Sequence, residues 1–74
     1  MLTKKAQYAF RALTVLAKRQ AQEEGATLWT SARDIVDASP MSLKFLEQIL
    51  VDLKAGGIIK SRRGPAGGHT LSGP

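Results

Sequence analysis

Apolar residues in the first part of the chain recur at the spacing of one helix face. The positions that follow this i, i+3, i+4, i+7 pattern are Ala9, Ala12, Leu13 and Leu16. Thr3 stands before the pattern as a suitable N-cap, and Gly25 can take the left-handed conformation that often follows a helix end. The pattern therefore predicts a first helix over residues 4–22, ended by residues 23–25.

Two further apolar patterns follow, each preceded by a polar cap. Ser31 and the acid three residues after it resemble a capping box, which predicts a short helix over residues 32–38. Pro40 ends this helix because proline pushes the preceding residue out of helical geometry. Ser42 is the next N-cap, and the pattern after it predicts a helix over about residues 42–55 that stops at two glycines. Its apolar face contains Leu46, Ile49, Leu50 and Leu53.

The pattern changes period after the helices. Residues 58–63 and 69–71 are β-prone, and the glycine-rich residues 64–68 between them predict a turn. Residues 28–30 can add one short edge strand. Three helices, the last two joined by a tight connection, and a hairpin predict a mainly α fold with a small β-hairpin. We expect residues 1–74 to form one winged helix-turn-helix domain, with the hairpin, about residues 58–71, as its wing.

Composition narrows the chemistry. The chain has 74 residues, no cysteine and one histidine, so it has no room for a cleft between domains and no thiolates for disulfides, metal sites or catalysis. No paired acid–base constellation accompanies its serines, so we expect no enzyme activity and no small-molecule substrate. No apolar run approaches the roughly 18 to 20 residues of a membrane span, and residues 1–5 lack the apolar stretch of a signal peptide. We expect a cytoplasmic protein without a membrane partner.

The positive charge is concentrated at the two ends of the chain. The formal charge is +5, from 11 Lys and Arg against 6 Asp and Glu. Residues 1–19 carry five bases and residues 54–74 carry four, and neither range contains an acid. This distribution favours a polyanionic partner that both ends contact together. A net charge of this size also occurs where charge serves solubility alone.

The exposed side of the third helix carries polar residues that can contact bases. Lys44 can donate to guanine, Gln48 can bond adenine, and Glu47 can accept from the amino group of cytosine. A helix fits the major groove of B-form DNA, where such groups distinguish base pairs. The alternative is an ordinary solvated helix face.

The hairpin gives a second indication of DNA binding. Arg62 and Arg63 precede a glycine-rich tip without bulky side chains, so the tip can approach phosphates while an arginine enters the narrow minor groove. The alternative is an ordinary turn flanked by charges. We expect His69 to be a partly exposed strand residue or a phosphate donor rather than a pH switch. Trp29 and Phe45 fit core or interface positions better than base-stacking positions, because basic residues do not alternate with them.

Two motifs resemble the IscR-like family of bacterial winged helix-turn-helix transcriptional regulators. They are the run Leu46-Glu47-Gln48-Ile49-Leu50 and the wing Arg63-Gly64-Pro65-Ala66-Gly67-Gly68. The resemblance implies a homodimer that binds a palindromic operator in double-stranded DNA, which we expect to act as a repressor. The residues expected to contact bases are Lys44, Glu47, Gln48 and Arg63. Those expected to contact the DNA backbone are Thr3, Lys5, Tyr8, Ser42, Arg62, Gly64, Gly67 and Gly68.

The resemblance covers only a DNA-binding half. Members of this family continue into a long dimerisation helix and, in sensing branches, a cysteine cluster that holds an iron–sulfur centre, and neither is present in residues 1–74. We therefore expect no cofactor in this chain, and an iron–sulfur cluster only where a cysteine-bearing C-terminal region exists. The competing hypothesis is a winged helix that docks a protein partner through its wing and Trp29 without sequence-specific DNA binding.

Overall fold

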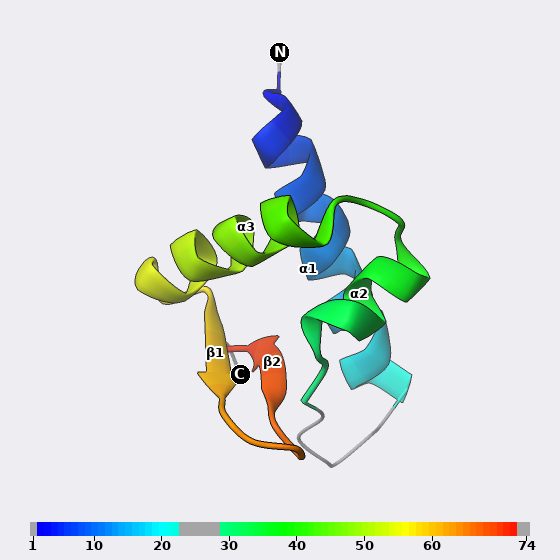
Figure 1. Cartoon of the computed structure of the whole chain (residues 1–74), viewed down its shortest axis with the longest axis vertical. Helices are drawn as coiled ribbons and strands as arrows, with labels where there is room; N and C mark the ends of the chain where they lie inside the picture. The colour runs from blue at the N-terminus through cyan, green and yellow to red at the C-terminus, as the bar shows by residue number, and fades with distance from the viewer. Residues whose placement is uncertain (1, 23–28, 73–74) are drawn as a thin grey trace.

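The computed structural model describes residues 2–22 and 29–72. Its elements, in chain order, are α1 (Lys4–Gln22), α2 (Ala32–Ala38), α3 (Leu43–Ala55), β1 (Ile59–Arg62) and β2 (Gly68–Leu71). The three helices have the predicted bounds to within one residue, which confirms the mainly α fold with a β-hairpin. In Figure 1, α3 crosses α1, α2 lies to one side, and the hairpin follows the C-terminal end of α3.

Local capping explains where the helices begin. Ser31 Oγ accepts a hydrogen bond of 3.1 Å from the Asp34 amide, and Ser42 Oγ accepts one of 3.3 Å from the Phe45 amide. Thr3 Oγ1 does the same for the third residue beyond it, at 3.1 Å. Each bond satisfies an amide that the first turn of a helix leaves free. The predicted end of α1 at residues 23–25 lies outside the described residues.

The core forms where the apolar faces of the three helices meet the hairpin. Its buried members are Ala12, Val15, Leu16, Ile35, Leu46, Ile49, Leu50, Leu53 and Ile59. The predicted apolar faces of the first and third helices are therefore the faces that the structure buries. Burial of one side of α3 leaves its opposite side to solvent.

The hairpin is antiparallel, with Ile59 opposite Leu71 and Arg62 opposite Gly68. β1 is shorter than the predicted strand over residues 58–63, and β2 begins one residue before the predicted 69–71. The prediction of an edge strand over residues 28–30 was wrong for Trp29, which is not in a strand. Thr30 makes only an isolated bridge to His69, through backbone hydrogen bonds of 2.9 and 2.8 Å, and Leu28 lies outside the described residues.

No helix within residues 2–22 and 29–72 is both long enough and apolar enough to cross a membrane.

Candidate nucleic-acid interface

The solvent-facing side of α3 carries the predicted base contacts. Lys44, Glu47 and Gln48 are exposed, while Leu46 and Ile49 beside them point into the core. Val51 continues the same face at i+7 from Lys44 and is 60% exposed. Sequence reasoning missed Val51 because it considered only polar residues, although the helical spacing alone would have found it.

Contacts from α1 set the position of α3. The Tyr8 ring meets the Phe45 ring edge-on, with centroids 5.4 Å apart and an interplanar angle of 72°. Tyr8 thus covers the contact between α1 and α3, and the Arg11 guanidinium lies 5.1 Å from the centre of its ring. Phe45 and Tyr8 both pack against the core, which confirms the core role expected for Phe45.

Three predicted backbone contacts already have partners within the chain. Lys5 on α1 forms an ion pair with Asp52 on α3, and both side chains remain about half exposed. The hydroxyls of Thr3 and Ser42 accept capping hydrogen bonds, which leaves their protons free to donate. Asp52 therefore competes with a phosphate for Lys5, whereas the two hydroxyls can donate to a phosphate and keep their caps.

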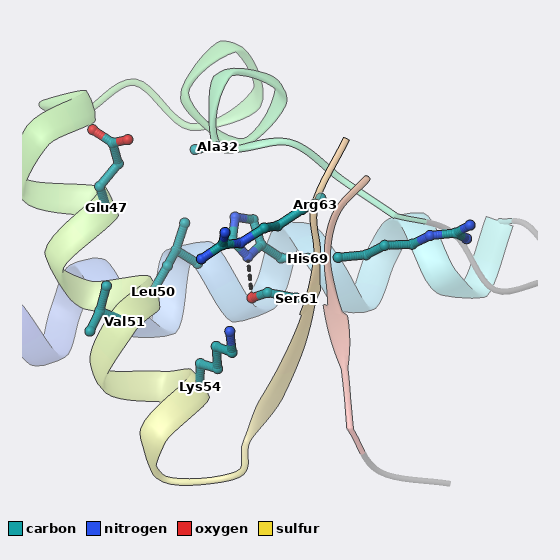
Figure 2. A pocket seen from close by; sticks show the side chains of 10 residues that line it. Ala32, Glu47, Leu50, Val51, Lys54, Ser61, Arg63 and His69 are labelled. Carbon is teal, nitrogen blue, oxygen red and sulfur yellow. Dashed lines mark hydrogen bonds between the residues drawn. The ribbon is translucent and has the colours of Figure 1, made fainter. Parts of the chain in front are cut away.

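The two arginines of the hairpin point in different directions. Arg62 is the last residue of β1, and Arg63 lies just beyond the strand. The Arg62 guanidinium lies 5.9 Å from the centre of the Trp29 ring. Figure 2 shows Arg63 reaching from the hairpin toward α3, to the side on which Glu47 also lies. Arg63 thus joins the face of α3, and Arg62 lies against Trp29.

The glycines of the wing are required by the fold of the hairpin itself. Gly64 has φ 103°, a conformation that a side chain disfavours. A Cβ at Gly67 would overlap the carbonyl of Arg62, and one at Gly68 would lie 2.7 Å from the backbone carbonyl group of Thr30. These glycines therefore determine the shape of the hairpin tip. This structural role does not test the phosphate contacts that the sequence predicts for them.

A hollow of about 320 Å³ separates α3 from the hairpin. Lys54, Ser61, Arg63 and His69 line it together with Glu47 (Figure 2). Ser61 Oγ and His69 Nδ1 share a hydrogen bond of 2.9 Å. Burial, and then the positive charge of Lys54, lower the pKa of His69 below its ordinary value of 6.5, so the ring is neutral at neutral pH.

The sequence alone did not predict that Lys54 and His69 lie around the same hollow. Lys54 lies in the last turn of α3 and His69 lies fifteen residues later in β2, so only the docking of the hairpin on α3 makes them neighbours. The placement of His69 as a partly buried strand residue agrees with one of the two roles expected for it.

Comparison with known proteins decides the family. Residues 2–74 match Rrf2, described as an iron-dependent transcriptional regulator. The chain belongs to the Rrf2 family. It is 38% identical over 73 residues to the HTH-type transcriptional regulator IscR of Cereibacter sphaeroides, covering 99% of this chain and 45% of that protein.

Solved structures of the Rrf2 family have the same fold. CymR, the global cysteine regulator of B. subtilis, matches with a TM-score of 0.85 at 29% identity, over 99% of this chain and 53% of its own. IscR of T. potens matches with a TM-score of 0.83 at 27% identity, over 99% of this chain and 50% of its own. These relatives are named as regulators, in agreement with the expectation of a non-enzyme. The chain spans about half the length of the curated relatives it matches.

The residues of this chain are not suited to bind the iron that the description of the Rrf2 family names. Iron–sulfur clusters are held by cysteine thiolates, and the chain has no cysteine. Within residues 2–22 and 29–72, no three His, Asp or Glu side chains gather closely enough to hold a metal ion.

Proposed function

We propose that residues 1–74 are the DNA-binding half of a transcriptional regulator that recognises a specific sequence in double-stranded DNA. The observation that carries this proposal is that Glu47 of α3 and Arg63 of the hairpin line the same hollow. Gln48 is exposed on α3, and Arg63 extends from the hairpin toward that helix. A helix with exposed polar groups fits the major groove, and an arginine at a narrow tip fits the adjacent minor groove.

The proposed contacts divide by type. Lys44, Glu47 and Gln48 on α3 contact base edges in the major groove, and Arg63 enters the minor groove. The backbone contacts proposed from the start of the chain, the N-cap of α3 and the wing are Thr3, Lys5, Tyr8, Ser42, Arg62, Gly64, Gly67 and Gly68. The charge of +5 supports them, since the positive ends of the chain attract phosphates without regard to sequence.

The whole protein is proposed to act as a homodimer on a palindromic operator. Two linked recognition helices would bind two half-sites about one helical turn apart, which raises affinity without new contacts. The relatives are about twice as long as this chain, which leaves room for a dimerisation segment in the whole protein. A DNA partner places the protein in the cytoplasm, and an iron–sulfur cluster would require cysteines outside residues 1–74.

The test is selection of bound duplexes from a pool of randomised sequence by the chain fused to a dimerising coiled coil. We expect a palindromic consensus to emerge, and Gln48→Ala to weaken binding to it by about 1 to 3 kcal/mol while sparing random duplex. Lys18→Ala is the matched control, since Lys18 lies on α1 beside a different hollow from the one next to α3. It should weaken both duplexes alike. Equal affinity of the fusion for consensus and random duplexes would refute the proposal and favour the protein-docking alternative.

A further inference from the structure

The hollow between α3 and the hairpin collects donors that the proposed base contacts leave unused. Lys54 comes from the last turn of α3, Ser61 from β1 and His69 from β2. Figure 2 draws the amino group of Lys54 on the side of Ser61, and the Glu47 carboxylate pointing away at the other end of the group. Glu47 is the one acidic residue among the described residues that line the hollow. The end near Lys54 is therefore suited to an anion.

The hydrogen bonding of His69 leaves one ring nitrogen for a ligand. Nδ1 is held by Ser61 Oγ at 2.9 Å, and Nε2 has no hydrogen-bond partner within residues 2–22 and 29–72. The other charged groups that line the hollow are Lys54 and Glu47 from α3, Arg62 at the end of β1 and Arg63 just after it. An anion between Lys54 and the ring would offset the Lys54 charge and stabilise the imidazolium form.

The geometry of B-form DNA supplies such an anion. A helix in the major groove and a tip in the adjacent minor groove lie on the two sides of one sugar–phosphate strand. With α3 and Arg63 placed as proposed above, that strand passes over the hollow between them. One of its phosphates then comes to lie opposite Lys54 and His69.

We propose that Lys54, Ser61 and His69 form a phosphate-binding site between α3 and the hairpin. The site rests on the proposed docking of α3 and the wing, but not on sequence specificity. Lys54 Nζ and His69 Nε2–H donate to the phosphate oxygens, and Ser61 holds the ring in place through Nδ1. The ligand chemistry is a phosphate oxyanion, which a DNA backbone or free inorganic phosphate can supply.

The chain offers a direct probe, because His69 is its single histidine. The pKa of His69 is measured by NMR titration of its ring protons at one ionic strength in three samples: chloride, inorganic phosphate, and a duplex of random sequence. We expect the duplex to raise the pKa of His69 relative to chloride. An equal rise with inorganic phosphate would show a site open to free anions, and no rise with it would show a site that only a DNA backbone fills.

Two lysine variants distinguish the effect of a local phosphate contact on His69 from the effect of the overall electrostatic potential of the DNA. Lys54→Ala should raise the pKa of His69 in chloride, since it removes a neighbouring positive charge, and should shrink the further rise caused by duplex. Lys18→Ala should change neither value, because Lys18 lies by another hollow. The same rise in both variants would assign the effect to the overall potential of the duplex and overturn the proposal.

Binding measurements give an independent check. Duplex affinity of the unaltered chain should increase as the pH is lowered from about 7.5 toward 5.5, because binding takes up a proton at His69. His69→Gln should remove this increase while the chain remains folded by circular dichroism. The fluorescence of Trp29, the single tryptophan, reports binding of a random duplex. If such a duplex binds without changing the pKa of His69, the phosphate site is overturned and the proposed function still stands.

Discussion

Arg11 Nη2 donates a hydrogen bond of 2.7 Å to the carbonyl of Pro40, which lies 29 positions later in the chain. Arg11 Nε also donates to Ser39 Oγ at 2.9 Å. The Arg11 guanidinium, on α1, therefore holds the turn between α2 and α3. This turn fixes the angle between α2 and α3. Arg11 therefore helps to position the exposed face of α3, although it lies on α1.

Replacing Arg11 with methionine should destabilise the fold and weaken DNA binding together. The variant keeps an apolar stem beside Tyr8 but loses both donors, which should cost about 1 to 2 kcal/mol of unfolding free energy. Chemical denaturation and duplex binding measure the two effects. Arg33→Met is the control, because Arg33 is an exposed residue of α2 and makes no hydrogen bond or ion pair within residues 2–22 and 29–72. Equal stability losses in the two variants would contradict the role of Arg11.

Asp52→Asn should strengthen binding to duplexes of any sequence. The Asp52 carboxylate competes with a phosphate for Lys5, and it also repels the DNA. An exposed pair contributes little to stability, so the unfolding free energy should change by less than about 1 kcal/mol. Binding isotherms at several salt concentrations test this. Unchanged affinity in the variant would show that Lys5 does not approach the backbone.

Much of the fold could be predicted from the sequence because its determinants are local. Ser31 and Ser42 cap the helices that follow them, and apolar spacing marks the buried faces, so the helix bounds come from neighbouring residues. The pairing of Lys5 with Asp52 and the contact of Arg62 with Trp29 depend on how distant segments pack. Spacing along the chain does not encode those distances, so the hollow at His69 appeared only in three dimensions.

Gly68→Ala should destabilise the chain more than Gly57→Ala. Both glycines have positive φ, 152° at Gly68 and 76° at Gly57, so each alanine incurs backbone strain. Only at Gly68 would the new Cβ meet a backbone, that of Thr30, while nothing lies within 4 Å at Gly57. We expect a loss of about 1 kcal/mol at Gly57 and about 3 kcal/mol or more at Gly68. Chemical denaturation compares them, and equal losses would contradict a close approach of β2 to Thr30.

The stability of the free chain should fall in mildly acidic solution through His69. Its pKa in the folded chain is below the value of 6.5 that the unfolded chain has, so the unfolded state binds more protons between these two values. The contribution of His69 is complete above the unfolded pKa and is lost as the pH falls toward the folded one. His69→Gln, which does not titrate, should flatten this part of the pH profile of unfolding. An unaltered profile in the variant would assign the pH dependence to other groups.

Substitutions of the two hairpin arginines should have different effects on recognition. Arg63 extends toward α3, whereas Arg62 lies against Trp29, so only Arg63 is placed to enter the minor groove beside the recognition helix. Arg63→Ala should cost about 1 to 3 kcal/mol on a selected duplex and flatten base preference at the positions that the wing contacts. Arg62→Ala should weaken all duplexes alike, lower the salt dependence by about one unit of slope and alter Trp29 fluorescence. Arg63→Lys keeps the charge but loses the planar fork, so it should restore random-duplex affinity without restoring preference. If Arg63→Lys matched the original chain in both respects, Arg63 would be acting as a phosphate contact alone.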